Sequence, residues 1–170
     1  AKEGLSEEEA GRKVRYEAFC NASEKYKCNK VAIAHNKNDN AETILLNMFR
    51  GSGIKGLTGI QPKIDMKTET GLITVIRPLL FATRKEIEAY LAERSLNYRT
   101  DSTNLENLYT RNKIRNTILD YAAKEINSNV IEHITKAGAH LYETQEFIEK
   151  CIMDRYTAIV REKPGFFEYD

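Results

Sequence analysis

The sequence lacks most of the features that mark special classes of protein. In 170 residues it contains no tryptophan, three prolines and three cysteines. The composition, with 41% hydrophobic and 30% charged residues, excludes a disordered chain. An apolar run of membrane-span length and a signal peptide are also missing. We therefore expect a globular cytoplasmic protein with no membrane partner.

The cysteines and the charge balance argue against two further kinds of site. Cys20, Cys28 and Cys151 form no CxxC pair, and no histidine stands at metal-ligand spacing from them. Idle thiols in a reducing compartment are therefore expected in place of a zinc or iron–sulfur site. Because the formal net charge is only +1, a nucleic-acid partner would have to bind a local basic patch.

Hydrophobic periodicity predicts a helix, a strand and a second helix in the first part of the chain. Apolar residues at helical spacing predict a long helix over residues 6–28. The short apolar run at 31–34 is typical of a buried parallel strand. A helix is expected at about 39–49. Its expected inner face consists of Ile44, Leu45 and Met48.

A hairpin and another helix are expected next. Residues 60–64 and 72–76 are predicted strands joined by a polar stretch. Thr83 and Glu86 form a capping-box pattern, which predicts that a helix begins there. The inner face expected for this helix consists of Ile87, Tyr90 and Leu91.

This alternation predicts an α/β fold with a Rossmann-like parallel sheet over residues 1–120. Nucleotide-binding α/β domains usually open with a strand, whereas this sequence opens with a charged helix, so the sheet is expected to be incomplete on its N-terminal side. Residues 121–170 are expected to be all helical, as a linker or as the start of a helical domain. The apolar stripe of that segment consists of Val130, Ile134, Ala137, Leu141, Ile148 and Ile152.

Three chemically competent side chains follow the first predicted strand. They are His35, Asp39 and Glu42. Ligands bind at strand ends in α/β sheets, and positions four and seven apart share one face of a helix. The three side chains can therefore converge on one side of the strand-to-helix turn. The structural alternative is that Asp39 and Glu42 form only a capping box.

The residues around this cluster resemble the segments of a known family. Residues 34–43, AHNKNDNAET, resemble the AHHxxDQxET motif of the N-type ATP pyrophosphatases that modify tRNA. Four further segments resemble the RGSGxxGLxGI, IRPLL, DSTN and RNxIR segments of tRNA(Ile)-lysidine synthetases, at residues 50–60, 76–80, 101–104 and 111–115. The five segments follow the family order over about residues 8–119. Asparagines at positions 36, 38 and 40 depart from the family pattern.

The resemblance implies an adenine nucleotide alpha hydrolase-like fold and a two-step reaction. ATP adenylates the C2 oxygen of the wobble cytidine in an isoleucine tRNA with a CAU anticodon. The amine of free L-lysine then attacks C2 and expels AMP, which leaves lysidine. ATP and Mg²⁺ are the implied cofactors, and a homodimer is a further implication. Because the family's SGGxDS loop for the ATP phosphates is missing from the sequence, the chain alone is expected to be an inactive fragment of the catalytic domain.

Within that reaction, His35, Asp39 and Glu42 are the expected catalytic residues. Asp39 and Glu42 are candidates for holding the lysine ammonium or magnesium, and Asp39 is the candidate Mg²⁺ ligand. His35 is expected to position lysine or the activated base, or alternatively to accept a proton.

Phosphate binding is expected from two basic regions. The expected ATP-binding residues are Arg50, Gly51, Ser52, Gly53 and Arg77, since glycine lets backbone N–H groups approach a phosphate. An ordinary surface loop is the alternative for residues 50–53. Arg111, Lys113 and Arg115 are expected to bind phosphates of tRNA or ATP, and the first and last share a helix face. The alternatives for these three are a solvated cationic stripe or an ion pair with Asp101.

Three other functions compete with lysidine formation. A tRNA thiolase of the same superfamily shares the AH…D…ET and RPL segments, but many thiolases carry cysteine pairs. A catalytically inactive RNA-binding relative would explain the missing ATP loop, but the nearly neutral net charge and the retained His35, Asp39 and Glu42 fit it less well. An α/β protein that binds only other proteins would leave the ordered segments unexplained.

Overall fold

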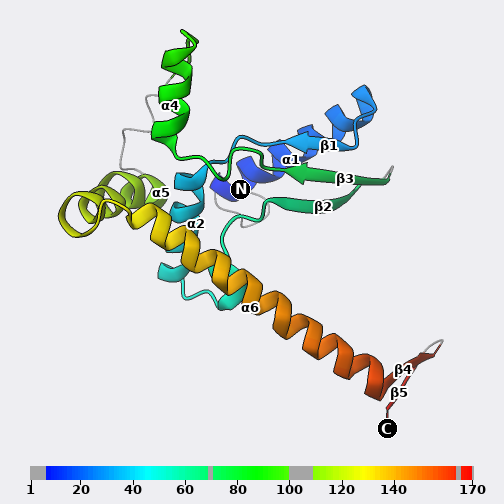
Figure 1. Ribbon diagram of the computed structural model, residues 1–170. Helices are drawn as coiled ribbons and strands as arrows, with labels where there is room; N and C mark the ends of the chain where they lie inside the picture. Colours follow the sequence, from blue (N-terminus) through cyan, green and yellow to red (C-terminus); the bar gives the residue numbers. More distant parts are fainter. Residues whose placement is uncertain (1–6, 69–70, 100–108, 164–165, 170) are drawn as a thin grey trace.

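The computed structural model describes residues 7–68, 71–99, 109–163 and 166–169 (Figure 1). The N-terminal capping pattern at Ser6 and the DSTN segment at 101–104 lie outside these residues. The elements in chain order are α1 (Glu7–Tyr26), β1 (Lys30–Ala32), α2 (Lys37–Phe49), α3 (Ile54–Leu57), β2 (Lys63–Thr68), β3 (Gly71–Ile76), α4 (Arg84–Glu93), α5 (Thr110–Lys113), the π-helical segments η2 (Ile114–Leu119) and η3 (Ala122–Ile126), α6 (Val130–Ile159), β4 (Val160–Lys163) and β5 (Phe166–Tyr169).

The first sheet is mixed and has the strand order β1-β3-β2. β1 runs parallel to β3, with Val31 opposite Val75, and β2 runs antiparallel to β3. The predicted hairpin is therefore confirmed, and the parallel pairing expected of a Rossmann-like sheet is present between β1 and β3. Only two residues separate β2 from β3, whereas a parallel connection needs a crossover of a dozen or more residues.

The helical core of the described chain lies between α2, η2 and α6. It is built from the buried residues Ala41, Leu46, Ile114 and Leu119, with Leu45, Val130, Ile131 and Ile134 packed against them. Ile44 is buried as expected, but Met48 is 53% exposed, so the expected inner face of α2 is only partly correct. α2 thus joins the sheet region to the helices that follow it.

Helix α4 begins as its sequence predicts but buries little. Thr83 accepts a hydrogen bond from the backbone N–H of Glu86, and the Glu86 carboxylate accepts one from the backbone N–H of Thr83. Ile87 and Leu91 are half-buried, whereas Tyr90 is exposed, so the inner face is narrower than expected. Figure 1 shows α4 projecting from the body of the molecule.

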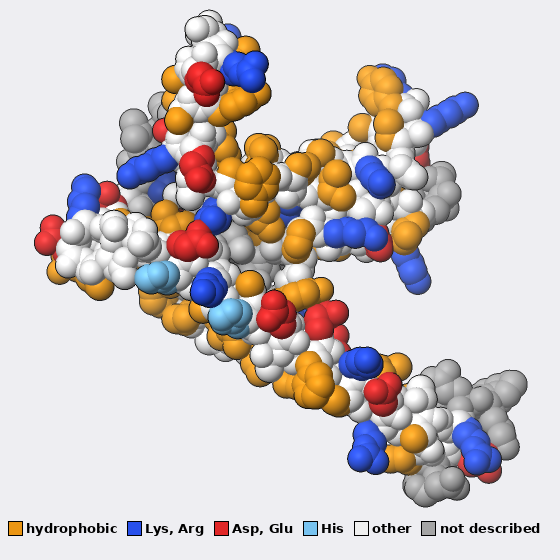
Figure 2. All heavy atoms as spheres, in the orientation of Figure 1, with side chains coloured by type: hydrophobic (Ala, Val, Ile, Leu, Met, Phe, Trp, Pro, Cys, Tyr) orange, Lys and Arg blue, Asp and Glu red, His pale blue; other side chains and the backbone are white. Residues whose placement is uncertain are grey.

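The two halves of α6 have different surroundings. The first half packs against α2 and α3, and a Cβ atom added at the buried Gly138 would lie 2.6 Å from Cδ1 of Ile44. The second half extends away from the body in Figure 1, and Figure 2 shows hydrophobic side chains along it. Phe147 and Ile152 are among the exposed ones. In the part of the chain that is described, no helix is both long enough and apolar enough to cross a membrane.

The chain leaves α6 through a two-stranded antiparallel sheet, so the expectation of an all-helical segment to residue 170 is wrong. β4 pairs with β5, with Val160 opposite Tyr169. Aromatic residues favour strands, and a Pro-Gly pair separates the two strands in the sequence. This local signal at 160–169 outweighs the helical spacing that precedes it.

Candidate active site

The start of α2 is fixed by an asparagine that departs from the family pattern. The side-chain oxygen of Asn36 accepts a hydrogen bond from the backbone N–H of Asp39 at 3.0 Å. Asp39 Oδ2 in turn accepts one from the backbone N–H of Asn36 at 3.0 Å. This reciprocal pair is a capping box, so the proposed Asp39–Glu42 box is wrong. Glu42 is therefore free for another role.

Glu42 lies at the centre of a buried ion-pair network. Its side chain is 0% exposed, and Oε1 accepts a hydrogen bond from Nε of Arg115 at 2.6 Å. Oε2 accepts hydrogen bonds from Nε of Arg111 at 3.0 Å and from Nη2 of Arg115 at 2.8 Å. Nη2 of Arg115 also lies 3.4 Å from Oδ1 of Asp39. We call these four residues the arginine cluster.

The arginine cluster assigns its members a structural role that the sequence did not predict. Two carboxylates and two guanidinium groups balance in charge, and the hydrogen bond with Glu42 raises the pKa of Arg115. Arg111 and Arg115 therefore pair with α2, which rules out a freely solvated stripe for these two. Lys113, between them, is exposed. Glu42 has no exposed surface, and its two oxygens accept three hydrogen bonds from arginines.

His35 takes part in a second polar group, which we call the histidine pair. Nδ1 of His35 accepts a hydrogen bond from Nε of Arg77 at 3.2 Å, and Arg77 is only 5% exposed. The other guanidinium nitrogens of Arg77 donate to the backbone carbonyl of Gln61 and to the hydroxyl of Tyr16. The sequence pattern pointed to His35 and Arg77 but not to Tyr16 or Gln61, which lie 61 and 16 residues from Arg77.

The surroundings of His35 favour a neutral ring. Burial lowers the pKa of His35 most, and the positive charges of Arg77, Arg111 and Arg15 lower it further. The carboxylate of Asp39 acts in the opposite direction. Because the net shift is downward from about 6.5, the imidazole is uncharged at neutral pH. The predicted trio is thus split: Asp39 and Glu42 share Arg115, while His35 pairs with Arg77.

The loop at residues 50–53 closes the opposite end of α2. Gly51 has φ +73°, and its N–H donates to the carbonyl of Met48, while the N–H of Ser52 donates to that of Asn47. This is the Schellman arrangement that ends many helices. The N–H groups of Gly51 and Ser52 are therefore already used, and Arg50 presents an exposed cation beside them. The expected phosphate contact of this loop stays a prediction.

The other two asparagines that depart from the family pattern also have structural partners. The side-chain oxygen of Asn38 accepts a hydrogen bond from the backbone N–H of Arg84, which ties α2 to α4. The side-chain oxygen of Asn40 accepts one from the backbone N–H of Ile60 at 2.7 Å. Gly59 has φ +75°, and a Cβ there would lie 2.2 Å from that same oxygen. These contacts hold two loops against the N-terminal half of α2.

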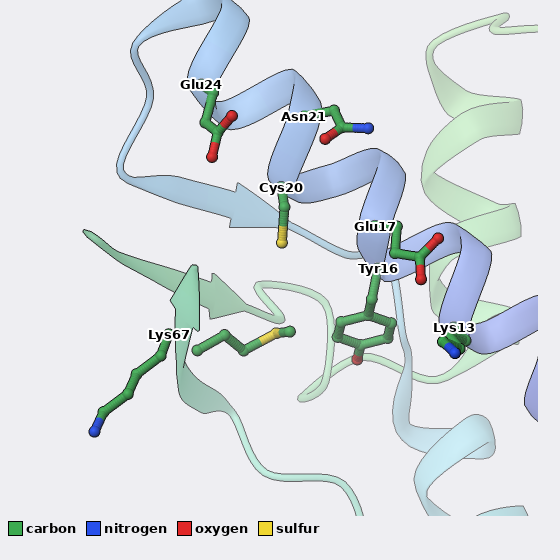
Figure 3. Close-up of a pocket in the computed structure, with 8 residues that line it drawn as sticks. Lys13, Tyr16, Glu17, Cys20, Asn21, Glu24 and Lys67 are labelled. Carbon is green, nitrogen blue, oxygen red and sulfur yellow. The ribbon is translucent and has the colours of Figure 1, made fainter. Parts of the chain in front are cut away.

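A pocket of about 630 Å³ lies between α1 and β2 (Figure 3). It is lined by Lys13, Tyr16, Glu17, Cys20, Asn21, Glu24, Met66 and Lys67. None of the predicted site residues lines it. Tyr16 connects this pocket to the histidine pair, because its hydroxyl accepts a hydrogen bond from Arg77.

An α/β body with a polar cluster beyond the end of a parallel strand is the arrangement expected of a nucleotide-binding domain. The PP-loop domain family matches residues 1–122, and the chain belongs to this family. The resemblance drawn from the ordered segments is confirmed. The tRNA(Ile)-lysidine synthase of Clostridioides difficile is 46% identical over 168 residues, which is 98% of this chain and 35% of that protein.

A second protein agrees in name, and a solved structure agrees in fold. The tRNA(Ile)-lysidine synthase of Caldanaerobacter subterraneus is 46% identical over 151 residues, covering 88% of this chain and 31% of that protein. The chain thus spans about a third of the length of these relatives. Among solved structures, the U34-tRNA thiolase NcsA from Methanococcus maripaludis matches with a TM-score of 0.61 and 18% identity, over 82% of this chain and 45% of that one. This last likeness concerns the fold alone.

Proposed function

We propose that the protein containing this chain is a ligase that joins lysine to the wobble cytidine of an isoleucine tRNA with a CAU anticodon. The observation that carries the proposal is the 46% identity to a tRNA(Ile)-lysidine synthase over 98% of the chain. In this reaction the C2 oxygen of cytidine attacks ATP and releases pyrophosphate. The lysine amine then forms the new C–N bond at C2, and AMP leaves together with a proton from the amine.

Asp39 is our candidate for binding the lysine ammonium, and Glu42 is not. An ionised carboxylate has about four acceptor positions, and Asp39 uses one for the N–H of Asn36 and one for a long contact with Arg115. Asp39 also keeps 15% of its side chain exposed, whereas Glu42 has no exposed surface. Glu42 instead forms ion pairs with Arg111 and Arg115, which both also contact Asp39. We therefore reassign Glu42 from a catalytic residue to a positioning residue.

A magnesium site on the described residues does not fit this arrangement. Glu42 is fully buried with both oxygens bonded to arginines, and the Asp39 carboxylate alone does not make a metal site. Within the described ranges, no group of three or more His, Cys, Asp or Glu side chains could hold a metal ion. We therefore assign no step of the reaction to a metal held by Asp39.

The candidates for phosphate binding are the basic side chains that remain accessible to solvent. Arg50 and Lys113 are exposed, and 29% of the Arg111 side chain is exposed although its Nε is bonded to Glu42. Exposed guanidinium and ammonium groups bind phosphate oxygens through charge-assisted hydrogen bonds. We assign Arg50 and Gly53 to ATP, and Lys113 with the exposed part of Arg111 to phosphates of ATP or tRNA. Arg115 and Arg77 support the site from within.

The partners of this activity are ATP, tRNA(Ile) and free L-lysine. The proposal places the protein in the cytoplasm, where these substrates occur, and includes a homodimer as its assembled form. Size-exclusion chromatography with light scattering tests the dimer, because a monomeric mass at micromolar concentration would contradict it.

The activity is tested with the complete protein, ATP, magnesium and tRNA(Ile) bearing a CAU anticodon, with and without lysine. AMP release that needs both tRNA and lysine supports the proposal. If a sulfur donor replaces lysine in this requirement, the protein is a tRNA thiolase and the proposal is wrong. If tRNA binds but no AMP forms under any condition, the protein is an inactive RNA-binding relative.

A further inference from the structure

The contact between Arg77 and His35 determines which imidazole nitrogen carries a proton. A guanidinium group has five N–H donors and no acceptor. Nδ1 of His35 must therefore be the acceptor in the 3.2 Å contact with Nε of Arg77. A neutral imidazole that accepts at Nδ1 carries its single proton on Nε2. The sequence motif identifies His35 as a candidate site residue, but its tautomer follows only from this contact.

Arg77 is held so firmly that it cannot easily offer another atom to His35. Its remaining guanidinium nitrogens bond to the carbonyl of Gln61 and the hydroxyl of Tyr16. Its backbone N–H donates to the carbonyl of Pro62 at 3.0 Å. With 5% exposure, Arg77 is fixed by the end of β3, by the loop before β2 and by α1. The donor atom that His35 faces is therefore held in place from three sides.

Nε2 is the open end of the histidine pair. In the described ranges of the chain, Nε2 of His35 has no hydrogen-bond partner. Every fully buried side-chain nitrogen or oxygen among these residues does have a partner, so Nε2 reaches solvent. A ring held at Nδ1 by a fixed cation, with its N–H facing solvent, is built to donate a hydrogen bond.

We propose that His35 donates a hydrogen bond from Nε2–H to an oxygen of the bound substrate and that Arg77 is the positioning residue that fixes this tautomer. The inference rests on the proposed function for the identity of the substrate. A ring that already carries a proton on its open nitrogen does not accept the proton of the lysine amine. That proton passes to solvent or to the carboxylate of Asp39, and His35 stabilises negative charge on the substrate oxygen instead.

The charges around His35 agree with this role. Arg77, Arg111 and Arg15 all disfavour a second proton on the ring, and Asp39 alone favours it. With burial as the largest effect, the pKa of His35 lies below its ordinary value. The ring is thus neutral at neutral pH and above.

Histidine NMR tests the tautomer without any substrate. In the complete protein with ¹⁵N-labelled histidine, the His35 signals are assigned by their loss in His35→Gln. We expect Nδ1 to be unprotonated and Nε2 protonated at neutral pH, and Arg77→Met to shift the ring toward a mixed tautomer with a higher pKa. A proton on Nδ1 in the unmodified protein, or a doubly protonated ring at neutral pH, would overturn the inference.

Kinetics of paired variants test the role in the reaction. The amide of His35→Gln can donate from a position close to Nε2 but cannot act as a base, whereas that of His35→Asn lies near Nδ1. We expect His35→Asn and His35→Ala to lower kcat about 10²–10³-fold, as loss of one fixed donor does. His35→Gln should recover at least roughly tenfold over His35→Ala, a factor of ten being ~1.4 kcal/mol. Equal loss in His35→Gln and His35→Ala would overturn the donor role.

The two experiments separate this inference from the proposed function. If the unmodified protein forms no lysidine, the proposed function fails, while the NMR result still decides the tautomer. If lysidine forms and the NMR finds Nδ1 protonated, the proposed function stands and the inference fails. Arg77→Met carries a risk of unfolding, because Arg77 is buried, and the His35 variants keep the test decisive in that case.

Discussion

The arginine cluster and the histidine pair lie at the same end of α2 but are built on opposite plans. In the cluster, Glu42 is fully buried and every oxygen is bonded to an arginine. In the pair, Arg77 is the buried partner, and His35 keeps one nitrogen open to solvent. The charged groups of the cluster bind one another, whereas the histidine pair leaves Nε2 of His35 accessible to solvent.

This difference separates structural from chemical residues within one motif. His35, Asp39 and Glu42 belong to a single AH…D…ET segment and look equally functional in the sequence. A group that is already saturated by fixed partners can position its neighbours but cannot bind a substrate. Only a group with a free donor or acceptor position can do so, which is the case for His35 and Asp39.

The largest expected effect is on the arginine cluster. Glu42→Gln removes one of the two negative charges of the buried network and leaves the two arginines with only the Asp39 carboxylate, so the free energy of unfolding should fall by about 3 kcal/mol. Urea unfolding followed by circular dichroism measures this loss. The matched control is Glu132→Gln, which breaks the exposed ion pair with Lys37 and should cost less than about 1 kcal/mol. If Glu42→Gln kept full stability but lost activity, Glu42 would be a substrate-binding residue, and the structural role of the arginine cluster would be contradicted.

Two glycines, Gly51 and Gly59, allow a second and smaller comparison, between a position with open space around it and a tightly packed one. Gly51 and Gly59 have almost the same φ, +73° and +75°, but a Cβ at Gly51 meets nothing within 4 Å, whereas one at Gly59 would lie 2.8 Å from Cγ1 of Ile44. Gly51→Ala should therefore cost about 1 kcal/mol from the backbone alone. Gly59→Ala should cost roughly 1–3 kcal/mol more because of overpacking against α2. Equal urea unfolding midpoints for the two variants would show that the backbone at Gly59 shifts to accommodate a Cβ atom at little cost.

Arg50 should affect function but not stability. Its side chain is exposed at the C-terminal end of α2, so Arg50→Gln should change the free energy of unfolding by less than about 0.5 kcal/mol. If it contacts an ATP phosphate, KM for ATP should rise on the order of tenfold, equal to ~1.4 kcal/mol. Steady-state AMP release at varied ATP measures this. An unchanged KM would remove Arg50 from the site.

The smallest effect concerns the pH dependence of stability. The pKa of His35 is lowered in the folded protein, so below about pH 6.5 the unfolded chain binds more protons at this residue than the folded one. His35 therefore contributes a loss of stability as pH falls from about 7 through the folded pKa, and contributes nothing at higher pH. The urea midpoint should fall less on acidification in His35→Gln than in the unmodified protein. Identical pH profiles would place the His35 pKa at its ordinary value.

Local signals predicted the elements that depend on near neighbours in the chain. The capping box at Thr83 placed the start of α4, and the short spacing between two apolar runs gave the β2–β3 hairpin. The start of α2 was misplaced because Asn36 and Asp39 compete as capping residues, and both patterns are plausible in the sequence. The hairpin β4–β5 was missed because a short aromatic signal follows a helix of 30 residues.

The arrangement of the candidate site depended on contacts that no local pattern contains. Arg111 and Arg115 were placed on one helix face, but their partner Glu42 lies 69 and 73 residues away. The proposed partner Asp101 lies outside the described residues, whereas Arg115 makes three contacts to Glu42 and Asp39. The roles of the three asparagines were equally hidden, since each side chain bonds to a backbone group fixed by tertiary packing or by the cap.

The sequence by itself determined the family, the chemistry-bearing segments and the start of α4, because these depend on residue identity, order and spacing. Only the tertiary structure decided which of those residues are saturated and which remain open. The physical reason is that a charged side chain cannot be buried without partners, and its partners come from wherever the chain packs against it. For Glu42 they come from η2 and α5, and for His35 the fixed partner is Arg77, just beyond β3, which leaves Nε2 open to solvent.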